Sequence, residues 1–156
     1  MSLYLLLKWA HILSATILFG TGIGIAFFKW MIDRSGDVRA IPLVNERTVL
    51  ADFIFTTPAV IIQPLTGFAL VYLANFPLSS GWLIWTVALY ALAGACWLPV
   101  LWLQIQMRDM AQLADAQNAP LPAHYWRYAR RWFWLGVPAF LSLVLVYWLM
   151  VFKPNL

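Results

Sequence analysis

The sequence has little charge and one cysteine, and both shortages limit what the protein can be. Only 10% of its 156 residues are Asp, Glu, Lys or Arg, whereas 63% are hydrophobic. Soluble domains carry about 25% charged residues, so this chain lacks the polar surface that a water-soluble globule needs. Cys96 cannot form an internal disulfide or provide a cysteine-based metal site, and we interpret it as a small apolar residue.

The short motifs of soluble enzymes are also missing. The sequence contains no Walker loop, Rossmann glycine pattern, nucleophile elbow or zinc motif, which argues against nucleotide-dependent and soluble hydrolase chemistry. The net charge of +4 comes from basic residues that flank the apolar segments. We therefore expect the lipid bilayer and its headgroups as a partner, and no nucleic acid.

Long uncharged runs dominate the chain instead. Residues 9–28, 53–107 and 132–152 contain no charged side chain. A membrane-spanning helix needs about 20 apolar residues, so the first and last runs suit one helix each. The middle run suits two helices, divided by the turn sequence of residues 75–81.

The predicted fold class is therefore an all-α membrane protein, a four-transmembrane-helix bundle in a single domain over residues 1–156. The helices are expected near residues 3–28, 50–74, 81–106 and 131–152. Basic residues concentrate between helices one and two and between helices three and four. By the positive-inside rule both connections face the cytoplasm of a bacterial inner membrane, and both termini lie on the outer (periplasmic) side.

A few polar residues interrupt the apolar runs, and they are expected at similar heights in the outer half of the bilayer. His11 with Ser14, Gln63, Thr66, Tyr90 and Ser142 could share one polar pocket if all face inward. His11 could act there as an axial iron ligand or a proton carrier. The alternative is that His11 only forms hydrogen bonds across the bundle, for example with Tyr90 or Gln63.

Other residues carry two interpretations each. Asp52 and Arg108 are expected at the inner ends of helices two and three, where they could form an interfacial ion pair or hold an anionic group. Gly20 and Gly24 form a GxxxG pattern that predicts close helix packing, within the bundle or between subunits. Trp97 could pack against helices and lipid, or line a pocket for a flat ring such as haem or a quinone.

Several stretches resemble a known family. Residues 8–22 (KWAHILSATILFGTG), 51–60 (ADFIFTTPAV) and 63–67 (QPLTG), together with the Trp97-Leu98-Pro99 segment, closely resemble the domain-of-unknown-function 2269 family of bacterial integral membrane proteins. This resemblance covers nearly the whole chain and implies no particular activity.

A more distant resemblance is to the HemJ-type protoporphyrinogen oxidases, four-helix inner-membrane proteins that bind haem b. Three dipeptides and one histidine match that family: Glu46-Arg47, Pro58-Ala59, Thr66-Gly67 and His11. The third helix departs from it, because Ile84 and Thr86 replace a histidine and a lysine. The resemblance implies haem b on His11. In such a site the polar residues at the same height, Gln63, Thr66 and Tyr90, would be the cofactor-binding residues that tune the haem or relay protons.

Three functions follow from these observations. The first is a haem-binding redox or electron-transfer protein that uses His11. The second is a non-catalytic membrane subunit or assembly partner of an oxidoreductase, as a homo-oligomer or with a redox partner protein. The third is a small-solute carrier, which the lack of an ion-coupling carboxylate in the predicted mid-membrane segments disfavours.

Overall fold

Helices account for almost the whole chain, as the uncharged runs predict. The computed structural model describes residues 2–155, and within them no strand occurs. The elements in chain order are α1 (Leu3–Ser35), α2 (Ala40–Ala51), a π-helical turn η1 (Asp52–Thr56), α3 (Thr57–Leu73), α4 (Gly81–Ala116) and α5 (Ala123–Phe152).

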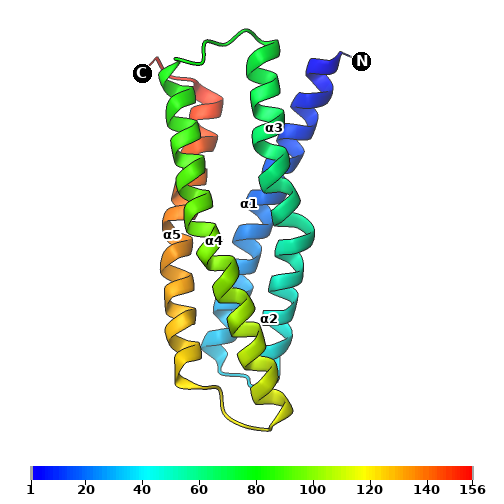
Figure 1. Cartoon of the computed structure of the whole chain (residues 1–156), viewed down its shortest axis with the longest axis vertical. Helices are drawn as coiled ribbons and strands as arrows, with labels where there is room; N and C mark the ends of the chain where they lie inside the picture. The colour runs from blue at the N-terminus through cyan, green and yellow to red at the C-terminus, as the bar shows by residue number, and fades with distance from the viewer. Residues whose placement is uncertain (1, 156) are drawn as a thin grey trace.

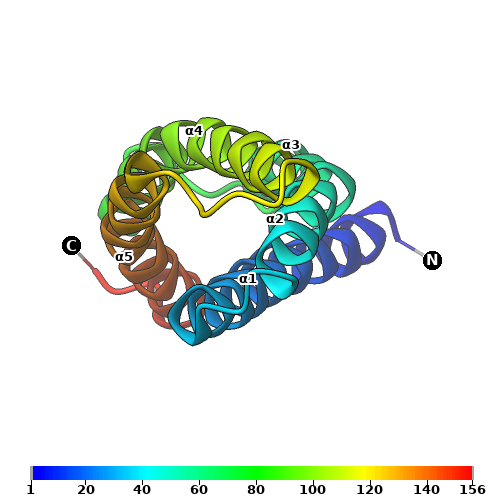
Figure 2. The ribbon, with the colours of Figure 1, turned by 90° about the horizontal axis from the view of Figure 1, so that it is seen from below.

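The elements form four long rods, because α2, η1 and α3 follow one another without a break. Each rod is long and apolar enough to cross a membrane, which confirms the predicted four-helix membrane fold. The rods stand around a central axis (Figures 1 and 2). Both termini and the α3–α4 turn lie at one end of the bundle, which we call the terminal end (Figure 1). The α1–α2 and α4–α5 connections lie at the opposite end, which we call the loop end.

The helices extend beyond the predicted spans at the loop end. The second rod begins at Ala40 and not near residue 50, and α5 begins at Ala123 and not near 131. The first rod also continues to Ser35, where Gly36 ends it with a φ of 67°. Hydropathy detects the point where polar residues begin, and the predicted spans end there. The helices continue past that point because packing between them stabilises their ends. Ile41, Met107, Ala111 and Tyr125 are fully buried there.

Packing is uneven around the bundle. The most extensive contacts join α4 with α5 and α1 with α3, while α1 and α5 touch less. The predicted close packing at Gly20 and Gly24 does not occur within the bundle, because a Cβ atom added to either would meet nothing within 4 Å in the described residues. Packing between subunits stays a prediction for this pattern.

Candidate functional site

His11 is the centre of a polar cluster between α1 and α3. Its Nδ1 lies 2.9 Å from the Thr66 hydroxyl and its Nε2 lies 3.1 Å from the Gln63 side-chain nitrogen. The Ser14 hydroxyl donates to the side-chain amide oxygen of Gln63, and it is also within donating distance, 3.1 Å, of the His11 backbone carbonyl one turn earlier. The structure therefore brings together four of the polar residues that the sequence placed at one height.

A glycine makes this close approach of the two helices possible. A Cβ atom on Gly67 would lie 3.1 Å from Cε1 of His11, closer than ordinary van der Waals contact. The imidazole thus lies directly over the α3 backbone, one residue past Thr66. The TG pair that the sequence analysis singled out has a structural cause here, since Thr66 binds the ring and Gly67 leaves room for it.

Tyr90 from α4 takes a different partner. Its hydroxyl donates a hydrogen bond of 2.8 Å to the Val60 carbonyl. Pro64 has no N–H to offer that carbonyl four residues earlier, so Tyr90 replaces the missing helical bond. Tyr90 and the His11–Gln63 pair still border one small cavity. Ser142 is buried on α5, and it borders neither of the two cavities found in the described residues.

Haem on His11 would require this geometry to change. Both ring nitrogens already have hydrogen-bond partners, so an iron bond would require Gln63 or Thr66 to be displaced. The adjoining cavity measures about 80 Å³, whereas cofactor pockets usually measure roughly 300–1,000 Å³. These residues are arranged as a hydrogen-bonded contact between two helices, which matches the alternative interpretation of His11.

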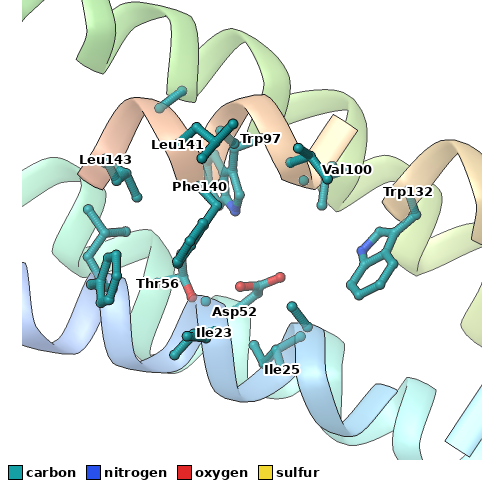
Figure 3. Close-up of a pocket in the computed structure, with 18 of the residues that line it drawn as sticks. Ile23, Ile25, Asp52, Thr56, Trp97, Val100, Trp132, Phe140, Leu141 and Leu143 are labelled. Carbon is teal, nitrogen blue, oxygen red and sulfur yellow. The ribbon is translucent and has the colours of Figure 1, made fainter. Parts of the chain in front are cut away.

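A much larger cavity lies nearer the loop end. It measures about 450 Å³ and is bordered by α1, the η1–α3 segment, α4 and α5 (Figure 3). Its walls are aliphatic and aromatic except at a few positions, and Gly22, Gly94 and Gly136 widen it on three helices. The volume falls within the range of small-molecule sites.

The cavity opens sideways, toward the position of the lipid. Its exposed lining residues all come from α1 and α5, the two helices that touch little: Gly22, Ile23, Ala26, Phe27, Trp30, Phe133, Phe140 and Leu141. The lining residues on η1 and α4, by contrast, are buried or half-buried. A molecule dissolved in the membrane could therefore enter between α1 and α5 without passing through water.

Nearly all the unsatisfied polar groups of the bundle border this cavity. Six buried side-chain atoms have no hydrogen-bond partner in the described residues, and five of them belong to cavity-lining residues. Those five atoms are Asp52 Oδ2, Thr56 Oγ1, Trp97 Nε1, Gln104 Oε1 and Trp132 Nε1. Buried polar groups without partners are rare in folded proteins, and five of them line this one cavity.

Asp52 is positioned by the π-helical turn. η1 begins at Asp52 and ends at Thr56, and both side chains point to the cavity (Figure 3). The Thr57 hydroxyl donates 2.9 Å to the Asp52 carbonyl, which stabilises the wider turn. Single π-turns inside long helices are frequent at functional sites. The sequence signal for this turn was the run Thr56-Thr57-Pro58, but its π character could not be read from it.

The predicted pairing of Asp52 with Arg108 does not form. Arg108 instead bonds its neighbour Asp109 at 2.8 Å, at the surface of α4. The physical reason is the extension of the second rod: α2 adds 12 residues before Asp52, roughly 18 Å at 1.5 Å per residue. Asp52 is consequently 3% exposed and lies inside the bundle, and not at the end of a helix.

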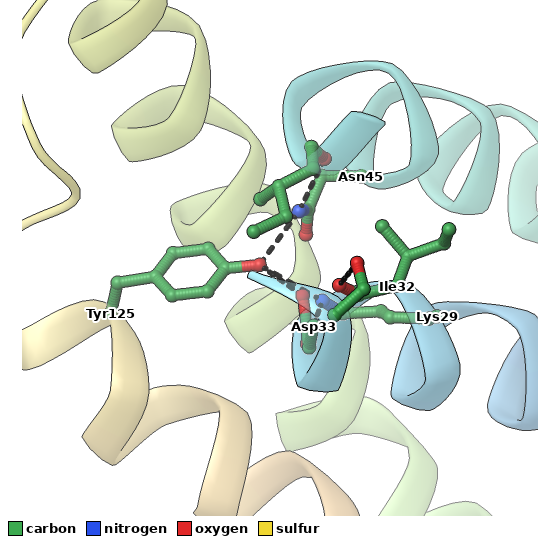
Figure 4. A network of polar contacts seen from close by, with 7 residues as sticks. Lys29, Ile32, Asp33, Asn45 and Tyr125 are labelled. Carbon is green, nitrogen blue, oxygen red and sulfur yellow. Dashed lines mark hydrogen bonds and ion pairs between the residues drawn. The ribbon is translucent and has the colours of Figure 1, made fainter. Parts of the chain in front are cut away.

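A second buried polar network was missed by sequence reasoning. Lys29 on α1, fully buried, pairs with Asp33 at 2.8 Å, and the Tyr125 hydroxyl donates to Asp33 at 2.7 Å. Asn45 on α2 donates to the same hydroxyl at 2.8 Å (Figure 4). The sequence analysis counted Lys29 only as a loop charge. The spacing of four between Lys29 and Asp33 was the available signal.

Comparisons with known proteins agree with the membrane fold and add no activity. No curated protein and no solved structure matches the chain, so the resemblance to HemJ-type oxidases has no support from them. A family described as "Predicted integral membrane protein (DUF2269)" has a model that matches residues 5–154. Because this match spans nearly the whole sequence, the chain belongs to the DUF2269 family of integral membrane proteins.

Proposed function

We propose that this membrane protein binds a lipid-soluble molecule carrying polar groups, in the cavity between α1, η1, α4 and α5. The observation that carries the proposal is the gathering of five unpaired buried polar atoms on one apolar cavity. A purely structural cavity would be lined by apolar atoms alone, because each unpaired polar group costs roughly 1–3 kcal/mol. A ligand that hydrogen-bonds to these atoms would recover that cost.

The lateral opening supports a ligand that arrives through the bilayer. The apolar walls would hold its hydrophobic part, and Asp52, Thr56 and Gln104 with the two indoles would orient its polar part. We place the protein in a bacterial inner membrane with both termini outside, following the basic residues near the loop end. The protein would then bind or carry its ligand within the membrane, which corresponds to the small-solute carrier among the three functions predicted from the sequence.

Two other functions stay predictions from the sequence. Haem-linked redox chemistry through His11 is not supported by the two occupied ring nitrogens. An absorption spectrum of wild type and His11→Ala tests it. A role as a membrane subunit or assembly partner is compatible with the fold, and copurification from native membranes tests it: a chain that always purifies alone contradicts that role.

The experiment for the proposed function is to fill the cavity. Gly94 and Gly136 line it, and an added Cβ at either position meets nothing within 4 Å. The variant Gly94→Leu therefore extends a side chain into the cavity from a Cβ atom that itself meets no neighbour. Gly20→Leu is the matched control, because Gly20 is equally unobstructed and does not line the cavity.

Binding of the neutral fluorophore N-phenyl-1-naphthylamine is measured on protein in lipid nanodiscs, with empty nanodiscs as background. We expect saturable binding to wild type and to Gly20→Leu. In Gly94→Leu we expect binding weaker by at least ~5-fold, since overpacking a site by a few methylenes costs about 1–3 kcal/mol. Equal binding in the two leucine variants, or no saturable binding to wild type, would contradict the proposal.

A further inference from the structure

The cavity is lined by one carboxylate and by no basic side chain. Asp52 is the only charged side chain among its lining residues. Ion pairs in residues 2–155 join Lys29 with Asp33, Arg47 with Glu46 and Arg108 with Asp109, and none includes Asp52. A buried carboxylate without an ion-pair partner is costly, so it favours a proton or a cation beside it.

The position of Asp52 deep in the bundle raises the cost of leaving its carboxylate unpaired. Its neighbours across the cavity include Ile23 of α1, Trp97 of α4 and Phe140 of α5 (Figure 3). All three lie within the uncharged runs of the sequence, so Asp52 stands at the level of membrane-embedded residues. An ionisable side chain at such a depth is a functional-site candidate by default. No carboxylate was expected at this level from the sequence.

The unpaired oxygens favour a donor. Asp52 Oδ2, Thr56 Oγ1 and Gln104 Oε1 are oxygen atoms without a hydrogen-bond partner in the described residues. The first is acceptor-only when ionised, and the other two can accept as well. A protonated amine supplies a positive charge to pair with Asp52 and N–H donors for all three oxygens. A carbonyl or a phosphate would supply neither.

Aromatic rings surround the same space. Tyr90, Trp97 and Trp132 border the cavity together with Phe19, Phe133 and Phe140. Rings of this kind attract a cation through their faces, most strongly where water is excluded. A small hydrated ion would not need such walls, which instead match the apolar body of an organic cation.

We infer that the ligand of this cavity is a lipophilic organic cation, a protonated hydrophobic amine whose charged nitrogen pairs with Asp52. The inference rests on the proposed binding function and specifies its ligand class. The aromatic and aliphatic walls hold the hydrophobic body, and Thr56 with Gln104 accept the remaining N–H bonds. Entry between α1 and α5 suits a molecule that partitions into the bilayer.

The test compares two ligands with one carbon skeleton, 3,3-diphenylpropylamine and 3,3-diphenylpropan-1-ol. The amine is a cation at neutral pH and the alcohol is uncharged, so their affinity ratio measures the charge preference of the site. Binding is followed by calorimetry on wild-type protein in zwitterionic nanodiscs, with empty nanodiscs subtracted. We expect the amine to bind at least ~10-fold more tightly, the scale of a desolvated charge pair.

The variants then assign the preference to one carboxylate. Asp52→Asn keeps the shape and removes the charge, and we expect it to lose the amine preference while alcohol affinity stays within about twofold. Asp109→Asn is the matched control, since Asp109 is surface-exposed and lies outside the cavity. Circular dichroism and elution volume verify that each variant folds. The ratio of amine affinity to alcohol affinity in the wild type tests the inference even if a variant does not fold.

The outcomes separate this inference from the proposed function. Equal affinity of amine and alcohol for wild type, both weakened by Gly94→Leu, would overturn the cation inference and leave membrane-ligand binding in place. An amine preference that survives in Asp52→Asn would also overturn it. No saturable binding of either compound, nor of N-phenyl-1-naphthylamine, would overturn both.

Discussion

The hydroxyl of Tyr90 donates to the carbonyl of Val60 across the α3–α4 interface, at 2.8 Å. The carbonyl is free because Pro64 cannot bond it from within the helix. One proline in the sequence thus creates the acceptor, and one tyrosine on a neighbouring helix occupies it. This bond links α4 to α3 between the two cavities that Tyr90 borders.

Replacing Tyr90 by Phe is expected to destabilise the bundle by about 1–3 kcal/mol, because the Val60 carbonyl would be left buried without a donor. The measurement is thermal or denaturant unfolding in detergent. Tyr72→Phe is the control, since Tyr72 is 81% exposed and its hydroxyl should contribute less than about 0.5 kcal/mol. Equal effects of the two substitutions would contradict the structural role assigned to Tyr90.

The loop-end network gives a second stability prediction. Lys29→Met removes the cation that pairs with Asp33 and leaves that carboxylate inside the bundle with the Tyr125 hydroxyl alone. Breaking one partner of a buried ion pair costs about 3–5 kcal/mol. Arg108→Met breaks a more exposed ion pair, worth only about 0–1 kcal/mol.

Unfolding of both methionine variants in the same detergent tests this difference. The double variant Lys29→Met with Tyr125→Phe should lose less than the sum of the single losses, because the two groups share Asp33. Additive losses, or a similar small loss for Lys29→Met and Arg108→Met, would show that the network does not hold the loop end together.

The glycine below His11 is a third point of sensitivity. Gly67→Ala would place a methyl group 3.1 Å from His11 Cε1, and the ring can give way only by loosening its contacts with Thr66 and Gln63. We expect Gly67→Ala to be about 1–3 kcal/mol less stable than Gly20→Ala, because both gain the same helix propensity and only the former overpacks a contact.

Gly20→Ala is a suitable reference, because a Cβ added at Gly20 meets nothing within 4 Å. The two alanine variants are compared by unfolding under one set of conditions. If Gly67→Ala were as stable as Gly20→Ala, the imidazole would not be held tightly over α3, and the geometry that argues against haem would lose its force.

The sequence predicted the fold better than the site, and particular residues show why. The membrane spans follow from uncharged runs, because a helix surrounded by lipid excludes charged side chains. Such a run can be recognised within a short stretch of the sequence. Likewise the match in height of His11, Gln63 and Thr66 follows from helix rise alone. What they contact depends on helix rotation: Tyr90 shares their height but bonds Val60, and Gly67 decides how closely α1 approaches α3.

The large cavity could not be predicted from single residues. It depends on how far α1 stands from α5 and on the extension of α2, which carries Asp52 away from the loop end. Asp52 was assigned to the boundary because the residues before it are polar, and a helix that continues through polar residues has no hydropathy signal. Lys29 was misassigned for the same reason, since burial by helices distant in sequence leaves no local pattern.

The spectrum of the purified protein is a fourth prediction. Because both His11 nitrogens are occupied and the adjoining cavity measures about 80 Å³, we expect no Soret band that depends on His11. The measurement uses protein from haem-supplemented cells, oxidised and reduced, for wild type and His11→Ala. A band present in wild type and lost in the variant would contradict the hydrogen-bonding role and restore the redox hypothesis.

The last prediction concerns the stability that a binding site gives up. Asp52 is 3% exposed and has an oxygen without a partner, so in ligand-free protein it should be a net cost to the fold. Asp52→Asn removes the charge while keeping the shape, and we expect the free energy of unfolding in detergent to rise by about 1–2 kcal/mol, as at other sites that trade stability for function.

Asp33→Asn is the contrasting variant, because Asp33 pairs with Lys29 and its neutralisation should destabilise the protein. If both substitutions were destabilising to a similar degree, Asp52 would have a structural partner within the bundle, and the case for a ligand at this carboxylate would fail.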